Sequence, residues 1–132
     1  MNKKYLAKII ATDNDGLQMI SACCAGAKVK ITDIKFLQNN KIFLISMQRS
    51  KVETDQHSKR INSICKFDFV DQVKSKNIDQ KKQDLVLELI AMNCFKNKDN
   101  YEINLMFNDN AYISLTTETI EVSLEDQSEI RK

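Results

Sequence analysis

Residues 64–95 carry the two hydrophobic patterns that most constrain the fold of this chain. In the first half, apolar and polar residues alternate as in a half-buried strand, and the apolar members are Cys65, Phe67, Phe69 and Val73. Residues 85–95 follow as an almost unbroken apolar run, which is typical of a central strand covered on both faces. We therefore predict two central strands joined by a basic turn, with the rest of the chain layered around this pair.

One segment near the N-terminus has the periodicity of a helix. Its apolar residues recur three to four positions apart, at Leu17, Ile20 and Cys24. Thr12 or Asp13 stands where an N-cap is expected, and Gly26 suits the left-handed residue that ends many helices. The pattern predicts one principal helix at about residues 13–25.

Apolar alternation elsewhere predicts strands over residues 5–11, 28–37, 41–49, 101–107 and 112–117. The alternation of the second strand changes parity near Thr32 and Asp33, which indicates a bulge or bend. Asparagine is expected to supply the left-handed turn residue at 38–40, because the chain has only two glycines. Residues 108–110 predict another tight turn. Residues 50–59 predict an exposed loop, and residues 118–129 fit either a strand or a helical face.

These elements predict an α+β fold with a single domain over residues 1–132. The sheet is expected to be mainly antiparallel, either curled or closed into a small barrel, with one N-terminal helix. Curvature or closure is needed because both limit the exposed edges of a long series of hairpins. At the level of topology alone, this arrangement resembles a pleckstrin-homology fold.

Charge and cysteine content bear on partner and compartment. The net charge of +2 argues against a dedicated nucleic-acid-binding domain. The four cysteines lack metal-ligand spacing, so we expect reduced thiols. Because neither a signal peptide nor a membrane span is recognisable, we expect a cytoplasmic protein with no membrane partner.

Several blocks of sequence, taken in order, resemble a known family: KIIATDNDGLQMISA, KVKITDIKFL, a strand ending QRSKVE, KFDFVDQVKSKNID, LVLELIAMNCF and ETIEVSLED. Over residues 8–126 the chain resembles small alphaproteobacterial proteins known only as a domain of unknown function (number two-nine-four-eight). This resemblance implies a stand-alone cytosolic protein with no assigned activity. The residue types that match the family pattern are Arg49, Asp68, Asp79, Glu118, Glu121 and Asp126. The chain departs from that pattern in its hairpin at 108–110, which is not glycine-rich, and in a shorter tail.

No group of residues predicts a catalytic, cofactor-binding or metal site, and no cofactor is expected. His57 is the only histidine and has polar neighbours, which favours a solvated surface residue. Asp68, Asp71 and Asp79 could form an acid–base pair, but solvated positions and turn caps explain them better. No glycine-rich phosphate-binding loop is recognisable, so an enzyme ranks third among the hypotheses.

The residues that we expect to contact an anionic ligand or a partner are basic. Lys74 and Lys76 leave the same face of a predicted strand, Lys81 and Lys82 follow in the turn, and Arg49 ends another strand. Together they could form a cationic patch for a phosphate or an acidic partner. The alternative, which we favour, is an edge strand that its lysines protect against aggregation.

Aromatic residues bear on the nucleic-acid hypothesis. Phe67, Phe69 and Phe107 fall on apolar faces, so we do not expect exposed rings beside the lysines for base stacking. The leading hypothesis is therefore an uncharacterised, non-enzymatic interaction or regulatory domain with an unknown protein partner. The alternative is nucleic-acid or phosphate-ligand binding through the basic strand face.

Overall fold

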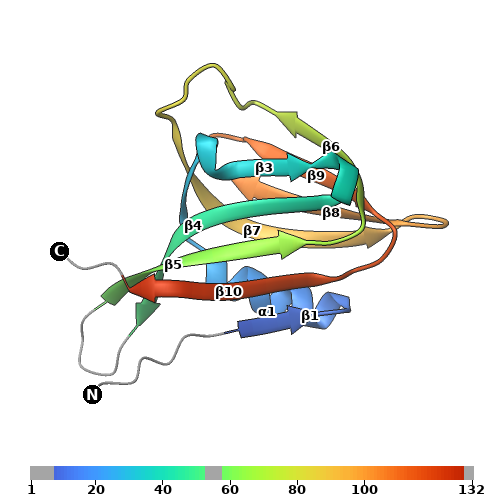
Figure 1. Cartoon of the computed structure of the whole chain (residues 1–132), viewed down its shortest axis with the longest axis horizontal. Coiled ribbons are helices and arrows are strands. Elements are labelled where there is room, and N and C mark those ends of the chain that lie inside the picture. The colour runs from blue at the N-terminus through green and yellow to red at the C-terminus, as the bar shows by residue number, and fades with distance from the viewer. Residues whose placement is uncertain (1–7, 53–57, 130–132) are drawn as a thin grey trace.

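The computed structural model describes residues 8–52 and 58–129, and its elements are shown in Figure 1. The one α-helix of these residues, α1 (Asn14–Cys24), follows the short strand β1 (Lys8–Ala11). The other strands are β2 (Lys28–Lys30), β3 (Ile34–Leu37), β4 (Ile42–Val52), β5 (Ser58–Phe67), β6 (Val70–Lys76), β7 (Val86–Lys96), β8 (Tyr101–Phe107), β9 (Tyr112–Thr117) and β10 (Val122–Glu129). Two 3-10 turns, η1 (Ile31–Asp33) and η2 (Gln38–Asn40), flank β3.

The strands form a single 10-stranded antiparallel sheet with the order β1–β10–β5–β4–β2–β7–β8–β9–β6, and β3 pairs with β4 beside this path. The sheet curls over, so that β7, β8 and β9 lie behind β3, β4 and β5 in the view of Figure 1. Buried apolar residues from both halves fill the interior, among them Phe43, Phe67, Leu89, Met92, Leu105, Leu115 and Leu124. The predicted α+β fold with a curled antiparallel sheet is confirmed. Over the described residues the sheet does not close into a barrel.

The helix begins and ends where the sequence predicts. Asp13 is the N-cap, and its Oδ1 accepts a hydrogen bond of 2.8 Å from the backbone N–H of Gly16. Gly26 follows the helix in the left-handed region with a φ of 85°. The apolar stripe through Leu17 and Ile20 is fully buried, so packing against the sheet stabilises the helix.

The prediction of two central strands joined by one turn is wrong. The alternating segment breaks at Phe69, whose φ is 60°, and it forms the end of β5 and then β6. β5 pairs with β4 and β10, whereas β6 pairs with β9 at the far end of the strand order. Phe69 therefore leaves the apolar face and is 42% exposed.

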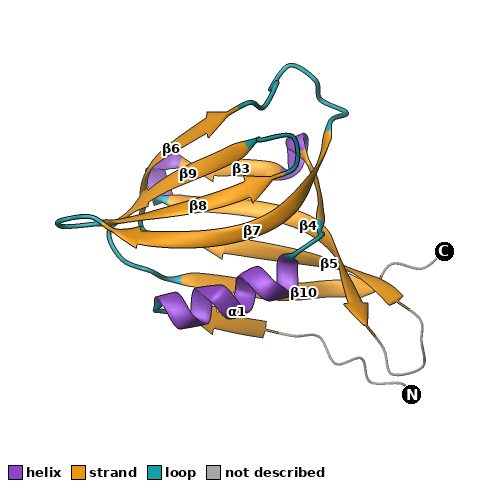
Figure 2. Ribbon diagram, turned by 180° about the vertical axis from the view of Figure 1, so that it is seen from behind, coloured by secondary structure: helices purple, strands orange, loops and turns teal. Residues whose placement is uncertain are grey.

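β7 is central in the strand order, but it is not covered on both faces as predicted. Leu87, Leu89 and Met92 are buried, whereas Ile90 and Phe95 on the other face are 49% and 57% exposed. Figure 2 shows α1 running beside β7. The helix satisfies backbone groups of β7, because the N–H of Met92 donates to the Oγ of Ser21 at 2.9 Å. The apolar residues of this run therefore serve different roles: some fill the core or pack against α1, and others lie on an exposed face of β7.

The structure can also be compared with the predictions for the turns and for the C-terminal segment. The expected bend near Thr32 is the 3-10 turn η1, which separates β2 from β3. The left-handed residue of the next turn is Lys41, with a φ of 58°, and not an asparagine as predicted. The predicted tight turn at 108–110 joins β8 to β9, and Asp109 and Asn110 both have positive φ there. The ambiguous tail forms strand β10.

The predicted loop over residues 50–59 is wrong at both of its ends, and residues 53–57 lie outside the described part of the chain. β4 runs to Val52 and β5 begins at Ser58, because this segment continues the pairing of the two strands. The prediction for His57 lies outside the described residues.

Candidate functional site

A buried ion pair links three strands of the sheet. The guanidinium of Arg49 on β4 donates to Asp126 on β10 through Nε at 3.0 Å and through a terminal nitrogen at 2.8 Å. The hydroxyl of Ser63 on β5 donates to the same carboxylate at 2.6 Å and accepts from Arg49 Nε at 3.1 Å. The Arg49 and Asp126 side chains are 7% and 0% exposed, so the charges neutralise each other within the interior.

This burial separates Arg49 from the predicted cationic patch. Its position on β4 has the same parity as Phe43, Ile45 and Met47, which are all buried. Asp126 likewise continues the alternation of the buried residues of β10. The sequence does carry a signal for the Arg49–Asp126 pair, namely opposite charges at two positions that alternation predicts to face inward. Our predictions did not use this signal.

Two cysteines lie in the same interior. Burial raises the pKa of the Cys24 thiol to about 12, and the nearby Arg49 guanidinium only partly opposes this shift. Burial also raises the pKa of Cys65 well above its usual value. Because the thiolate is the reactive form, both groups are poor nucleophiles at neutral pH.

The predicted lysine contacts lie on and after β6. Lys74 and Lys76 are exposed, and Val73, which precedes them, faces inward and is half buried. Lys81 and Lys82 are exposed in the segment that joins β6 to β7. β6 stands at one end of the strand order, so the structure brings these lysines to a sheet edge.

An apolar groove lies between β3 and β6, and we call it the β3–β6 groove. Ile34 and Phe36 of β3 form one side, and Val73 and Ser75 of β6 form the other. Phe43 and Ile113 also line the groove, whose volume is about 310 Å³. The remaining lining residues come from η1 and the segment after β6: Ile31, Thr32, Ile78, Gln80 and Gln83. The sequence did not predict this groove, because it arises from curvature that brings strands distant in sequence together.

The two sides of the curled sheet are tied together near the start of β6. The N–H of Val70 donates to the carbonyl of Lys41 at 2.8 Å. The ammonium of Lys41 lies 3.0 Å from Asp71 and 2.8 Å from Glu118, and the hydrogen bonds to Glu118 and then Asp71 raise its pKa. These contacts hold the two sides together at the Lys41 turn.

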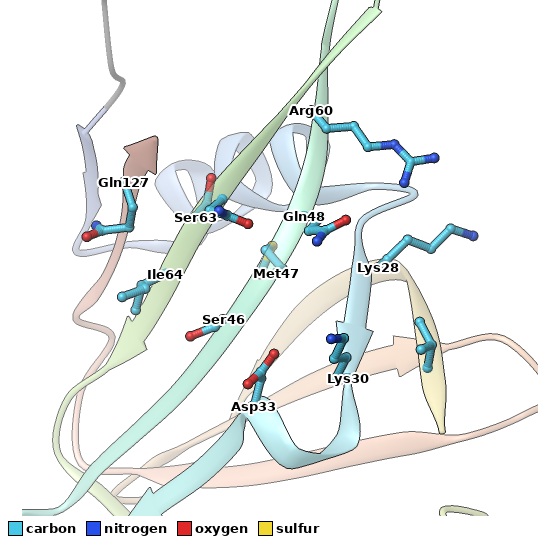
Figure 3. A pocket seen from close by; sticks show the side chains of 12 residues that line it. Lys28, Lys30, Asp33, Ser46, Met47, Gln48, Arg60, Ser63, Ile64 and Gln127 are labelled. Atoms are coloured by element: carbon cyan, nitrogen blue, oxygen red, sulfur yellow. The ribbon is translucent and has the colours of Figure 1, made fainter. Parts of the chain in front are cut away.

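A second hollow, of about 430 Å³, lies over β2, β4 and β5 and is polar (Figure 3). Lys28, Lys30 and Arg60 contribute positive charge, and Asp33 contributes a carboxylate. Lys28 is already paired with Glu88 at 2.9 Å. In Figure 3 the Arg60 and Lys28 side chains extend away from Lys30 and Asp33, so the cations do not converge on one point.

The candidate acid–base carboxylates have ordinary partners. Asp71 pairs with Lys41, Asp68 lies 3.8 Å from Lys66, and Asp79 accepts from the backbone N–H of Lys81 at 3.0 Å. Asp79 is therefore a turn cap, as the sequence suggested. Within residues 8–52 and 58–129, no group of three or more His, Cys, Asp or Glu side chains is arranged to hold a metal ion.

Comparison of the sequence with models of known protein families gives a match. A family model described as "Protein of unknown function (DUF2948)" matches residues 7–132. The chain belongs to this family. The match covers nearly the whole chain, which confirms the resemblance seen in the sequence blocks. Searches of curated proteins and of solved structures return no match.

One further property bears on the membrane prediction. No helix in the described part of the chain is long and apolar enough to cross a bilayer.

Proposed function

We propose that this chain is a non-enzymatic interaction domain that binds a protein partner at the β3–β6 groove. The observation that carries the proposal is the pair of strand edges beside an apolar groove. Over the described residues, β3 pairs with β4 alone and β6 pairs with β9 alone. Strand edges present unpaired backbone groups, and partner proteins commonly bind such edges by adding a strand.

The chemistry of the interior supports a non-enzymatic role. The buried thiols are held protonated, and the carboxylates considered for acid–base work pair with lysines or cap a turn. The β3–β6 groove contains no titratable residue among its lining side chains. An apolar groove of this kind is suited to holding side chains of a partner.

The proposal includes two further points. Free thiols at all four cysteines are typical of a reducing compartment, which supports a cytoplasmic location. One continuous hydrophobic cluster, together with a family match over residues 7–132, supports a single domain.

A blocking variant tests the proposed binding site. Ser75 lines the groove but is exposed, so Ser75→Trp should fill the groove without disturbing the core. Gln127→Trp is the matched control, because it places the same bulk on β10 at the polar hollow of Figure 3. Both variants should keep the wild-type circular dichroism spectrum. Proteins captured from native lysate by wild type should be retained by Gln127→Trp and lost with Ser75→Trp. Capture that Ser75→Trp leaves unchanged contradicts the proposal.

A second candidate function, single-stranded nucleic-acid binding, is favoured by one specific observation. Tyr112 on β9 is 37% exposed and stands opposite Lys76 on β6, so a ring does accompany the basic strand. Titration with single-stranded RNA at two salt concentrations tests this candidate. Binding that weakens steeply with salt and is lost in a Lys74→Glu/Lys76→Glu variant supports it. An absence of salt-sensitive binding by wild type removes it.

A further inference from the structure

The two edges of the β3–β6 groove share one pattern of side chains. On β3, Phe36 lines the groove and Lys35 is exposed on the opposite face. On β6, Val73 lines the groove and its neighbour Lys74 is exposed. Both edges therefore present mainly apolar side chains to the groove, with Ser75 as the polar exception. Both present lysine on the outer face, where β3 also carries the exposed Leu37.

Within residues 8–52 and 58–129, the exposed lysines of these edges form no ion pair. Each ion pair found there involves other cations: Lys28, Lys41, Arg49 and Lys66. Carboxylates do occur close by in sequence, at Asp33 and Asp79, but Asp79 caps its own turn. Lys35, Lys74 and Lys76 are thus left to attract carboxylates from outside the domain.

A strand that pairs with either edge must match this pattern. Successive side chains of a strand point to opposite faces, so every second residue of the added strand would point toward Phe43 and Ile113 at the base of the groove. These residues must be apolar. The residues between them would point to solvent beside Lys35 or Lys74, where carboxylates are favoured.

We propose that the occupant of the groove is an extended segment of a partner protein in which apolar and acidic residues alternate, and that it adds as a strand to the edge of β6 or β3. This inference rests on the proposed function, because it assumes that the groove is the binding site. It goes further by naming the chemistry of the partner segment.

Synthetic peptides of about eight residues, a usual strand length, test the inference. One peptide alternates valine or isoleucine with glutamate. A second has the same composition with the order scrambled, and a third alternates the same apolar residues with lysine. A fourth is the first peptide with N-methyl groups on alternate amides, which prevents pairing along one edge of its backbone. Binding is measured by fluorescence polarisation, and the site by backbone amide NMR shifts.

We expect the alternating acidic peptide to bind, to shift amides of β3 and β6, and to bind at least about tenfold more tightly than the other peptides. The Lys74→Glu/Lys76→Glu variant should weaken this binding about tenfold, since two exposed ion pairs are replaced by repulsion. Lys96→Glu/Lys98→Glu is the matched control, because it changes the same charge at the same spacing elsewhere on the surface, and it should leave binding nearly unchanged.

Equal binding of the scrambled or lysine peptide overturns the inference, as does binding that shifts amides away from the groove. RNA binding that depends on Lys74 and Lys76 in the absence of peptide binding overturns it in favour of a polyanion. The proposed function fails separately. If Ser75→Trp abolishes capture of a partner that lacks an alternating acidic segment, the groove is confirmed and only the partner chemistry is wrong.

Discussion

Replacement of Arg49 by methionine should destabilise the fold strongly. Methionine retains the apolar stem of the side chain and removes the guanidinium. Asp126, whose side chain is fully buried, then loses its two hydrogen bonds from the Arg49 guanidinium, at 2.8 and 3.0 Å. The hydrogen bond that Ser63 donates to it at 2.6 Å carries no charge to balance the carboxylate. Breaking a buried ion pair on one side typically costs about 3–5 kcal/mol, because the remaining charge stays buried.

The cost is a large fraction of the stability of an ordinary domain, which is about 5–15 kcal/mol. Urea unfolding followed by far-UV circular dichroism measures it. With a denaturant slope of about 2 kcal/mol per molar, the unfolding midpoint should fall by about 2 M urea.

A control and a compensating variant sharpen the prediction. Lys28→Met breaks the Lys28–Glu88 pair, whose side chains are 46% and 40% exposed, and should cost less than about 1 kcal/mol. Arg49→Met combined with Asp126→Leu removes both buried charges and should recover most of the lost stability. The reasoning is refuted if Arg49→Met unfolds at the same urea concentration as Lys28→Met, or if the double variant is no more stable than Arg49→Met.

Three further predictions concern single positions. Thr117 is fully buried, and among the described residues its Oγ1 is the buried side-chain oxygen without a hydrogen-bond partner, so Thr117→Val should leave stability unchanged or raise it by about 1 kcal/mol in urea unfolding; a loss of similar size contradicts this. Gly26→Ala should lower the free energy of unfolding by about 1–2 kcal/mol, because φ is 85° and alanine is strained there. No atom lies within 4 Å of the added Cβ, so the cost is backbone strain and not a clash, and Gly26→Asn should cost less. Equal stability of wild type and both variants would exclude backbone strain. The Cys24 thiol has an ordinary pKa of 9.0 and a folded pKa of about 12, so its contribution to stability is complete below pH 9 and is lost as pH rises toward 12. Cys24→Ala should therefore show a shallower loss of thermal stability than wild type between pH 9 and 11, and parallel curves would argue against the burial of this thiol.

The sequence by itself determined the local elements. The helix could be predicted because its cap, its apolar stripe and its terminal glycine all lie within fifteen neighbouring positions, Thr12 to Gly26. The hairpin strands β8 and β9 could be predicted because alternation and a turn at Asp109 and Asn110 are also local signals. The resemblance to the family came from the order and spacing of such local blocks.

The tertiary structure decided which strands pair and what faces inward. The alternation through Phe69 is a good strand pattern, but pairing of β5 with β10 and of β6 with β9 breaks it, and no local signal specifies these distant partners. Arg49 and Asp126 lie 77 positions apart, so the pair exists only because β4 and β10 both flank β5. The β3–β6 groove depends on the curvature of the whole sheet, which is the sum of twists along strands that are not neighbours in sequence. Local periodicity therefore determined the elements, and long-range pairing and curvature determined the candidate site.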